Sequence, residues 1–134
     1  MNRQSLSTAV QGLASSKGYD FHTASAEYLP ALASTKPTIV MLHPKFLSIE
    51  GHKHGKISHS LTLHALQGGA KLSHAERVTL LDTLENDVLD ILTSLSNESY
   101  VVAVEDICFT PSTLKLSVSG DVAITATCIV TCFF

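Results

Sequence analysis

Hydrophobic residues along this chain follow two spacings, the three-to-four spacing of helices and the two-residue spacing of strands. The first helical stretch covers residues 2–16, and Gly18 stands where a glycine commonly ends a helix. The second covers residues 73–95, where Ser73 and Glu76 have the spacing of an N-terminal capping box. One broad apolar stripe, typical of a helix packed on a sheet, follows it: Leu80, Leu81, Leu84, Val88, Ile91, Leu92 and Leu95.

Strand-like segments lie between the two helices. Residues 38–42 form a short apolar run typical of a buried strand, and residues 45–50, after Pro44, form a second strand or an extended edge. Residues 57–66 alternate between apolar and polar side chains, which predicts a half-buried strand. The glycine-containing residues 51–56 predict a turn before it.

Three more strands are predicted after the long helix, over residues 100–109, 114–118 and 122–134. Gly120-Asp121 is a hairpin signal before the last of them. Residues 19–36 are mixed and predict a loop with one short turn of helix or strand. The order is helix, two or three strands, helix, three strands. It predicts a single α+β domain over residues 1–134, with the helices on one face of a mainly antiparallel sheet.

The composition points to buried apolar surface. Of the 134 residues, 45% are hydrophobic and only 16% are charged, and the mean hydropathy is +0.24. No apolar run approaches the ~20 residues that span a membrane, so we expect the apolar excess to lie in the core or against other copies. The net charge of −3 is unfavourable for general nucleic-acid binding.

The chain has three cysteines, Cys108, Cys128 and Cys132. An odd number disfavours a disulfide framework and favours folding in a reducing compartment. Cys128 and Cys132 share one face of the last strand but lie too far apart along it to bridge. We expect all three cysteines at apolar-facing strand positions, as small hydrophobic side chains.

Seven histidines are many for this length, and His52, His54 and His59 crowd the loop before the alternating strand. A metal site would need the His52-x-His54 pair and a further ligand on a rigid element, yet the pair lies in a glycine loop. We therefore expect solvated side chains or contacts to a neighbouring subunit. The remaining histidines predict surface or half-buried side chains: His22, His43, His64 and His74.

Catalytic signatures are missing from the sequence. No serine lies in a GxSxG elbow, and Gly68-Gly69 has no phosphate-loop pattern around it. Glu105 and Asp106 are adjacent in a predicted strand, so they are expected to point to opposite faces rather than to form an acid/base pair. We expect no catalytic residue, no cofactor and no native metal site.

The last predicted strand is apolar on both faces, so it is either covered twice within the domain or buried in an interface. The low content of charged residues favours an interface. One face carries Val122, Ile124, Ala126, Cys128, Val130, Cys132 and Phe134. The other face supplies candidates for contact with a neighbouring copy: Thr125, Thr127, Ile129, Thr131 and Phe133. The polar loop supplies candidates for contact with another partner: Glu50, His52, Lys53, His54 and Lys56.

This order of elements, with a long helix containing HAERVTLLDTLENDVLDIL and a strand that runs to the last residue, resembles the tail-terminator, or tail-completion, proteins of long-tailed bacteriophages. The resemblance lies in architecture and pattern and is weakest over residues 19–36. It implies a structural virion protein that forms a homo-oligomeric ring of six copies. Such a ring caps the tail tube, joins it to neck and head-completion proteins, and lets DNA pass through its lumen. It also implies assembly in the host cytoplasm, with no enzyme activity or membrane partner.

Other functions stay open at this point. Head-closure and other neck connector proteins share overlapping features. A small metal-binding or enzymatic domain would use the His52/His54 loop, and an adaptor would capture another chain at a sheet edge.

Overall fold

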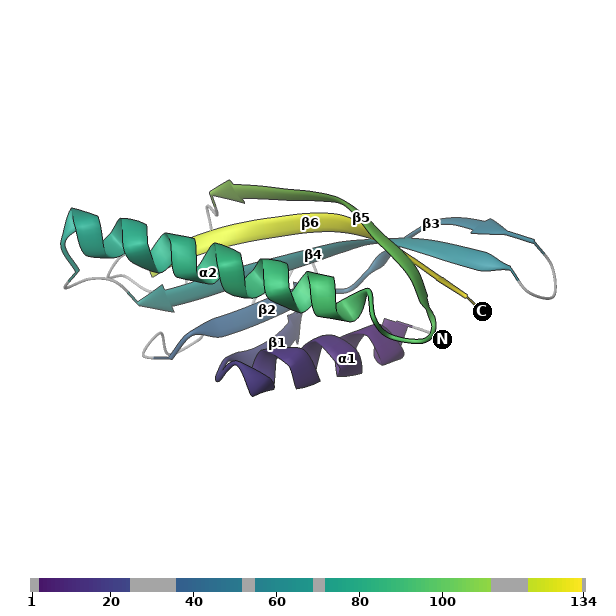
Figure 1. The fold of residues 1–134 in the computed structure, drawn as a ribbon, viewed down its shortest axis with the longest axis horizontal. Helices are drawn as coiled ribbons and strands as arrows, with labels where there is room; N and C mark the ends of the chain where they lie inside the picture. Colours follow the sequence, from purple (N-terminus) through teal and green to yellow (C-terminus); the bar gives the residue numbers. More distant parts are fainter. Residues whose placement is uncertain (1–2, 25–35, 52–54, 69–71, 112–120, 134) are drawn as a thin grey trace.

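The computed structural model describes residues 3–24, 36–51, 55–68, 72–111 and 121–133. Within them the chain forms two helices and six strands: α1 Arg3–Ser16, β1 Asp20–Ala24, β2 Thr38–Leu42, β3 Lys45–Glu50, β4 Lys56–Gly68, α2 His74–Leu95, β5 Val101–Pro111 and β6 Asp121–Phe133 (Figure 1). The predicted α+β class is confirmed. The predicted strand over residues 114–118 and the hairpin glycine Gly120 lie outside the described residues.

The six strands form one sheet in the order β1-β2-β4-β6-β5, with β3 also paired to β4. β4 is its spine, because β6 runs antiparallel along its whole length. The other edge of β4 is shared: β2 pairs with one half, and β3 with the other. β2 and β3 thus follow each other almost end to end, separated at His43 and Pro44, since proline cannot donate to a strand ladder.

The sequence pattern does not predict one of the strands as a separate element. Residues 20–24, within the segment predicted as a loop with a short turn of helix or strand, form β1 and pair in parallel with β2. Four strands therefore lie between the helices instead of two or three. All other strand pairings are antiparallel.

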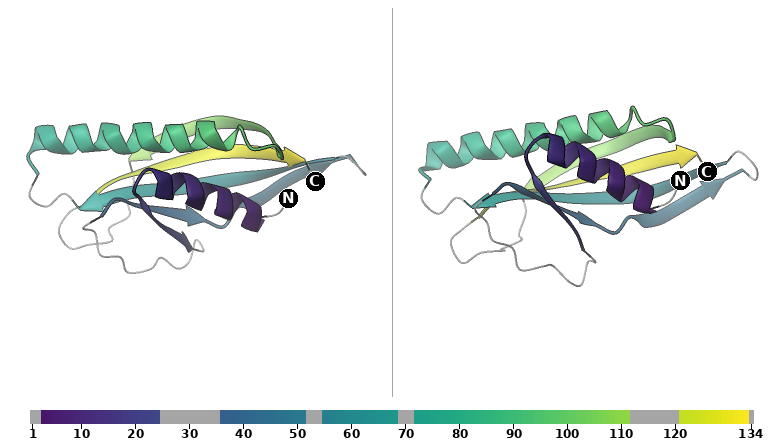
Figure 2. Two further views of the ribbon diagram at one scale, coloured as in Figure 1. Left: turned by 60° about the horizontal axis from the view of Figure 1, so that its bottom comes forward. Right: turned by 90° about the horizontal axis from the view of Figure 1, so that it is seen from below.

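Both helices pack on the same face of the sheet (Figure 2). The α2 stripe is buried as predicted, with Leu84, Val88, Ile91, Leu92 and Leu95 fully enclosed. α1 adds Leu6, Val10 and Ala14, and the sheet adds Ile39, Met41, Leu61, Leu63 and the even-numbered side chains of β6 from Val122 to Cys132. Two contacts join the helical layer: Tyr19 donates a 2.6 Å hydrogen bond to Asp87, and Lys17 lies 3.2 Å from Asp90.

The ends of the helices match their sequence signals. Gly18 adopts φ 82° after α1, a conformation that glycine takes without strain. At the start of α2, the Glu76 amide donates to the Ser73 hydroxyl and the Ser73 amide donates to the Glu76 carboxylate, both at 3.2 Å. The predicted capping box is confirmed.

Ser73→Ala is expected to lower the free energy of unfolding by about 1 kcal/mol, because the Glu76 amide loses its acceptor at the end of the helix. Urea denaturation measures this change. The neighbouring exposed substitution His74→Ala is the control and should stay within about 0.5 kcal/mol of the wild type. Equal effects of the two substitutions would mean that the capping box adds no measurable stability.

A bulge in β5 changes which side chains face the core. The register with β6 shifts between Glu105 and Cys108, and Asp106 adopts φ 55°. Without the shift Cys108 would lie opposite Ala126 and face the core; with it, Cys108 lies opposite Thr127 and is exposed. The prediction of an apolar-facing Cys108 is therefore wrong, whereas Cys128 and Cys132 are buried and unbridged as expected.

The same bulge affects the adjacent acidic pair. Regular strand alternation predicts opposite orientations for Glu105 and Asp106, but the bulge interrupts that alternation at Asp106. Both residues are exposed.

A second, small core lies on the sheet face turned away from the helices. It consists of Ala24, Val40 and Leu66, all buried, with Leu42 and Ala123 packed against them. The face opposite the helices is therefore buried at one end of the sheet, where β1, β2, β4 and β6 meet.

Candidate functional site

The predicted interface residues of β6 share one surface, which we call the open face. It is the side of β4 and β6 away from the helices. The even-numbered side chains of β6 enter the main core, so the odd-numbered ones face the other way. The open face therefore carries all five β6 candidates: Thr125, Thr127, Ile129, Thr131 and Phe133.

Cross-strand pairs order this surface. Ser58 and Thr131 hydroxyls lie 2.9 Å apart, and His64 Nδ1 lies 2.8 Å from the Thr125 hydroxyl. Such pairs stabilise a sheet and limit side-chain motion. Burial lowers the pKa of His64, which favours the neutral ring at this hydrogen bond.

The open face extends onto the β3–β4 hairpin. Glu50 pairs with Lys56, and Lys56 pairs with Phe133, so the three residues form one row across three strands. The Phe133 side chain is 46% exposed, and Thr127 is exposed. Two candidates from the polar loop thus join the β6 candidates on a single surface. His52, Lys53 and His54 lie outside the described residues.

β3 carries apolar residues that the sequence reading did not single out. All six of its residues are exposed, including Phe46 (50%), Leu47 (48%) and Ile49 (55%). With the facing part of β4, β3 extends beyond the ends of both helices (Figure 1). The sequence could have indicated an apolar strand here, because KFLSIE contains three large apolar residues and no glycine or proline.

His59 is buried, whereas a solvated side chain was expected for the histidine cluster. It lies in β4, within the strand predicted over residues 57–66, and is 3% exposed. Its position opposite Phe46 turns it toward the helical face, where the two rings meet edge to face at 6.4 Å. Its Nδ1 has no hydrogen-bond partner among the described residues. Burial, and secondarily the charge of Arg3, lowers the pKa of His59. As expected, the other histidines are exposed or half-buried: His22, His43, His64 and His74.

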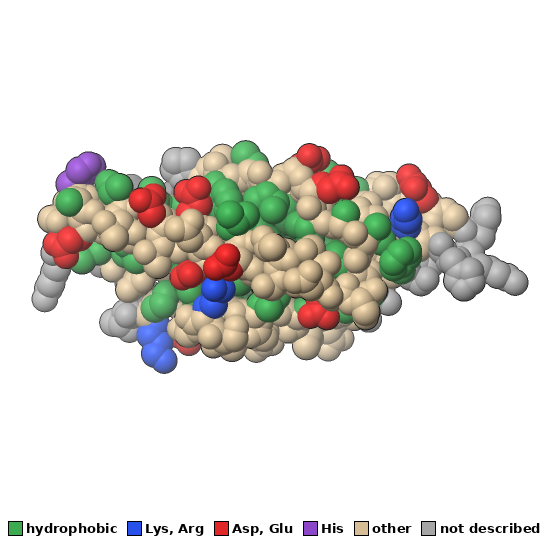
Figure 3. All heavy atoms as spheres, in the orientation of Figure 1, with side chains coloured by type: hydrophobic (Ala, Val, Ile, Leu, Met, Phe, Trp, Pro, Cys, Tyr) green, Lys and Arg blue, Asp and Glu red, His purple; other side chains and the backbone are tan. Residues whose placement is uncertain are grey.

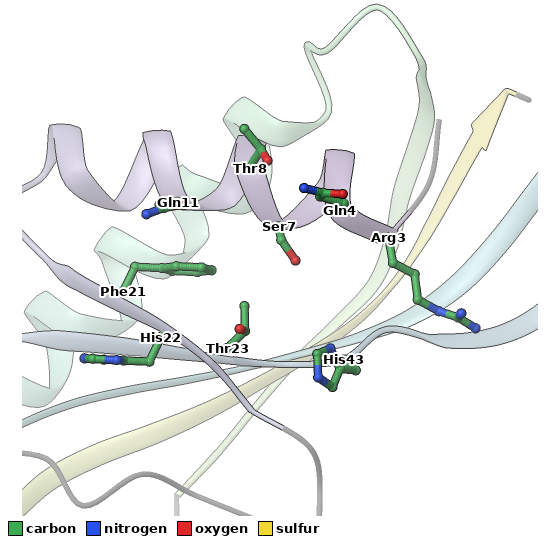
Figure 4. A pocket seen from close by; sticks show the side chains of 9 residues that line it. All are labelled: Arg3, Gln4, Ser7, Thr8, Gln11, Phe21, His22, Thr23 and His43. Carbon is green, nitrogen blue, oxygen red and sulfur yellow. The ribbon is translucent and has the colours of Figure 1, made fainter.

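A cavity of about 620 Å³ lies between α1 and β1. Arg3 and His22 lie on opposite sides of it and do not converge (Figure 4). Arg3 extends to one side, where its Nε donates a 2.8 Å hydrogen bond to the Pro44 carbonyl, and His22 extends to the other. This arrangement does not assemble an anion site. The cavity is lined by Arg3, Gln4, Ser7, Thr8, Gln11, Phe21, His22, Thr23 and His43.

The electrostatics of the helical face do not resemble those of a nucleic-acid interface. In Figure 3, acidic side chains are scattered over the visible face and basic ones are few. A protein that binds nucleic acid needs a basic patch. In the described parts of the chain, no three His, Cys, Asp or Glu side chains gather in a metal-binding group. Neither described helix is long and apolar enough to cross a membrane.

A scan against protein-family models gives no match for this chain, and neither does a search of the curated proteins.

Proposed function

We propose that this protein is a structural virion component. It forms a closed homo-oligomeric ring that terminates the tail tube of a long-tailed bacteriophage and joins it to the neck. The open face supports the contact between copies, and the tail role rests on the resemblance in the order of elements. The open face places Thr125, Thr127, Ile129, Thr131 and Phe133 in one row, on a rigid sheet backed by the helical layer.

The chemistry of this row suits contact between protein surfaces. Hydroxyl groups that are already aligned by cross-strand pairing can bond to a neighbour at little entropic cost. Ile129 and Phe133 add apolar area, and Glu50 and Lys56 add one charge of each sign at the end of the row. A ring closes through heterologous contacts, so this face would meet a different surface of the next copy.

The full-length protein is expected to sediment as one discrete oligomer. Ile129→Lys should dissociate it, because a lysine at this half-buried position would have to be desolvated in the contact. Glu85→Lys, which makes a charge change on the exposed side of α2, is the matched control and should assemble normally. Sedimentation velocity measures the species, and circular dichroism confirms that each variant is folded. A wild type that remains strictly monomeric at high concentration would contradict the ring.

The tail role needs a separate test. Wild-type oligomer is expected to bind the ends of tail tubes from the phage that encodes it, as seen by negative-stain electron microscopy. Ile129→Lys should leave the tube ends bare. An oligomer that does not bind tube ends would be consistent with the ring but would contradict the terminator role.

A further inference from the structure

The outer edge of β3 is an unusual surface for a small domain. Within the described residues β3 pairs with β4 alone, and all six of its side chains are exposed. Exposed apolar edge strands are templates for pairing with another chain, and proteins usually protect them with charges or prolines along the strand. β3 carries its charges only at the ends, Lys45 and Glu50, with Phe46, Leu47 and Ile49 between them.

A bulge in β3 puts the two charged ends of the strand on the same face of the sheet. In a regular strand Lys45 and Glu50 would point to opposite faces, since they are an odd number of residues apart. The register with β4 shifts between Phe46 and Ser48. Lys45 then lies opposite Ser60 and Glu50 opposite Lys56, so both point to the open-face side. Phe46 and Ile49 both point to the helical side by the same argument, opposite His59 and Ile57.

The order of β3 side chains is therefore self-complementary. Two copies placed antiparallel about an axis perpendicular to the sheet bring each Lys45 opposite the partner's Glu50. The same arrangement brings each Phe46 opposite the partner's Ile49. Directly opposed unlike charges and apolar pairs both stabilise antiparallel strands. A parallel arrangement would instead oppose like charges.

The other long edge strand fits β3 less well. β5 has only acidic charges, Glu105 and Asp106, both exposed at its bulge. They complement Lys45 but repel Glu50. Charge complementarity thus favours a second β3 over β5 as the partner of this edge.

We propose that two copies of this protein pair through β3, antiparallel and in the register that joins Lys45 to the partner's Glu50. The two sheets then continue into one another across a two-fold axis. A six-residue strand offers a small contact compared with stable dimer interfaces, so the dimer is weak and depends on protein concentration. Two-fold pairing is isologous, whereas ring contacts are heterologous. Glu50 lies both at the end of the open-face row and in the β3 contact. The other β3 residues lie outside that row, so the β3 contact does not rest on the proposed ring.

Charge reversal tests the register. Lys45→Glu alone and Glu50→Lys alone each oppose like charges at both ends of the strand pair, and each should weaken dimerisation about tenfold or more. An equimolar mixture of the two variants restores unlike pairs at both ends and should form a mixed dimer near wild-type strength. Glu85→Lys is the control for net charge and should dimerise as the wild type does. Sedimentation over a concentration series measures the association, with every protein carrying Ile129→Lys so that the proposed ring does not contribute.

A thiol cross-link tests the same register independently of any larger assembly. The background is Cys108→Ser, because Cys108 is an exposed native thiol. Phe46→Cys protein mixed with Ile49→Cys protein should form a disulfide-linked dimer under mild oxidation, and each variant alone should form far less. The β3 pairing is overturned if either variant alone cross-links as well as the mixture. It is also overturned if the charge variants dimerise as the wild type does. Loss of the β3 dimer with tube-end binding intact would separate the two proposals.

Discussion

Leu84→Ala is expected to lower the free energy of unfolding by about 2–5 kcal/mol, the largest effect of any single change considered for this protein. The Leu84 side chain is fully buried under α2 and belongs to the main core. Truncation removes apolar burial and leaves a cavity that the surrounding helix and sheet fill only in part. Urea denaturation at low protein concentration, monitored by circular dichroism, measures the change without a contribution from assembly.

Leu89→Ala is the matched control for this substitution. It makes the same chemical change on the same helix, at a side chain that is 40% exposed. It should shift the free energy of unfolding by no more than about 0.5 kcal/mol. Comparable losses at both positions would contradict the packing of α2 through the Leu84 stripe.

His59→Leu is expected to stabilise the protein, by about 1–3 kcal/mol, and to reduce its sensitivity to acid. Leucine removes a buried ring nitrogen, Nδ1, that has no hydrogen-bond partner among the described residues. An apolar side chain at this position would pack against Phe46 and would not need to be desolvated.

The pH dependence follows from the lowered pKa of His59 in the folded protein. The unfolded chain takes up a proton near the ordinary histidine pKa of about 6.5, whereas the folded protein takes it up only at lower pH. The unfolded state therefore binds more protons in this interval, and stability falls as the pH drops below about 6.5. His64, whose pKa is also lowered by burial, adds to the same slope.

Denaturation midpoints at about pH 8 and about pH 5 distinguish these contributions. The wild type should lose more stability between the two values than His59→Leu, and His64 should account for part of what remains. Leu89→Ala, which changes an exposed side chain without a titratable group, should keep the wild-type slope. An unchanged slope in His59→Leu would mean that His59 does not titrate with unfolding.

The open face and the β3 edge suit two different kinds of protein contact. The open face combines aligned hydroxyls with isolated apolar side chains, which suits a polar contact between ordered surfaces. The β3 edge offers backbone pairing with exposed apolar side chains, including Phe46 and Ile49 on the helical side. Ile129→Lys and Lys45→Glu are therefore expected to act on separate equilibria.

Local sequence patterns predict the parts of this structure that depend on neighbours along the chain. The Ser73–Glu76 capping box and the stripe from Leu84 to Leu95 are set by contacts three and four residues apart. The alternation of apolar and polar residues likewise predicts the buried and outward faces of β4 and β6 correctly, because these strands are regular. The common face of the five β6 candidates followed from the same rule.

Features that depend on pairing between distant segments do not follow from local patterns. The β5 bulge moved Cys108 to the outside and the β3 bulge brought Lys45 and Glu50 to one side, because a one-residue slip reverses every following side chain. His59 is buried because β3 sets Phe46 beside it, and the row of Glu50, Lys56 and Phe133 exists because three strands meet in register. Local spacing does not locate a bulge, because a bulge forms where strands distant in the sequence bond to one another.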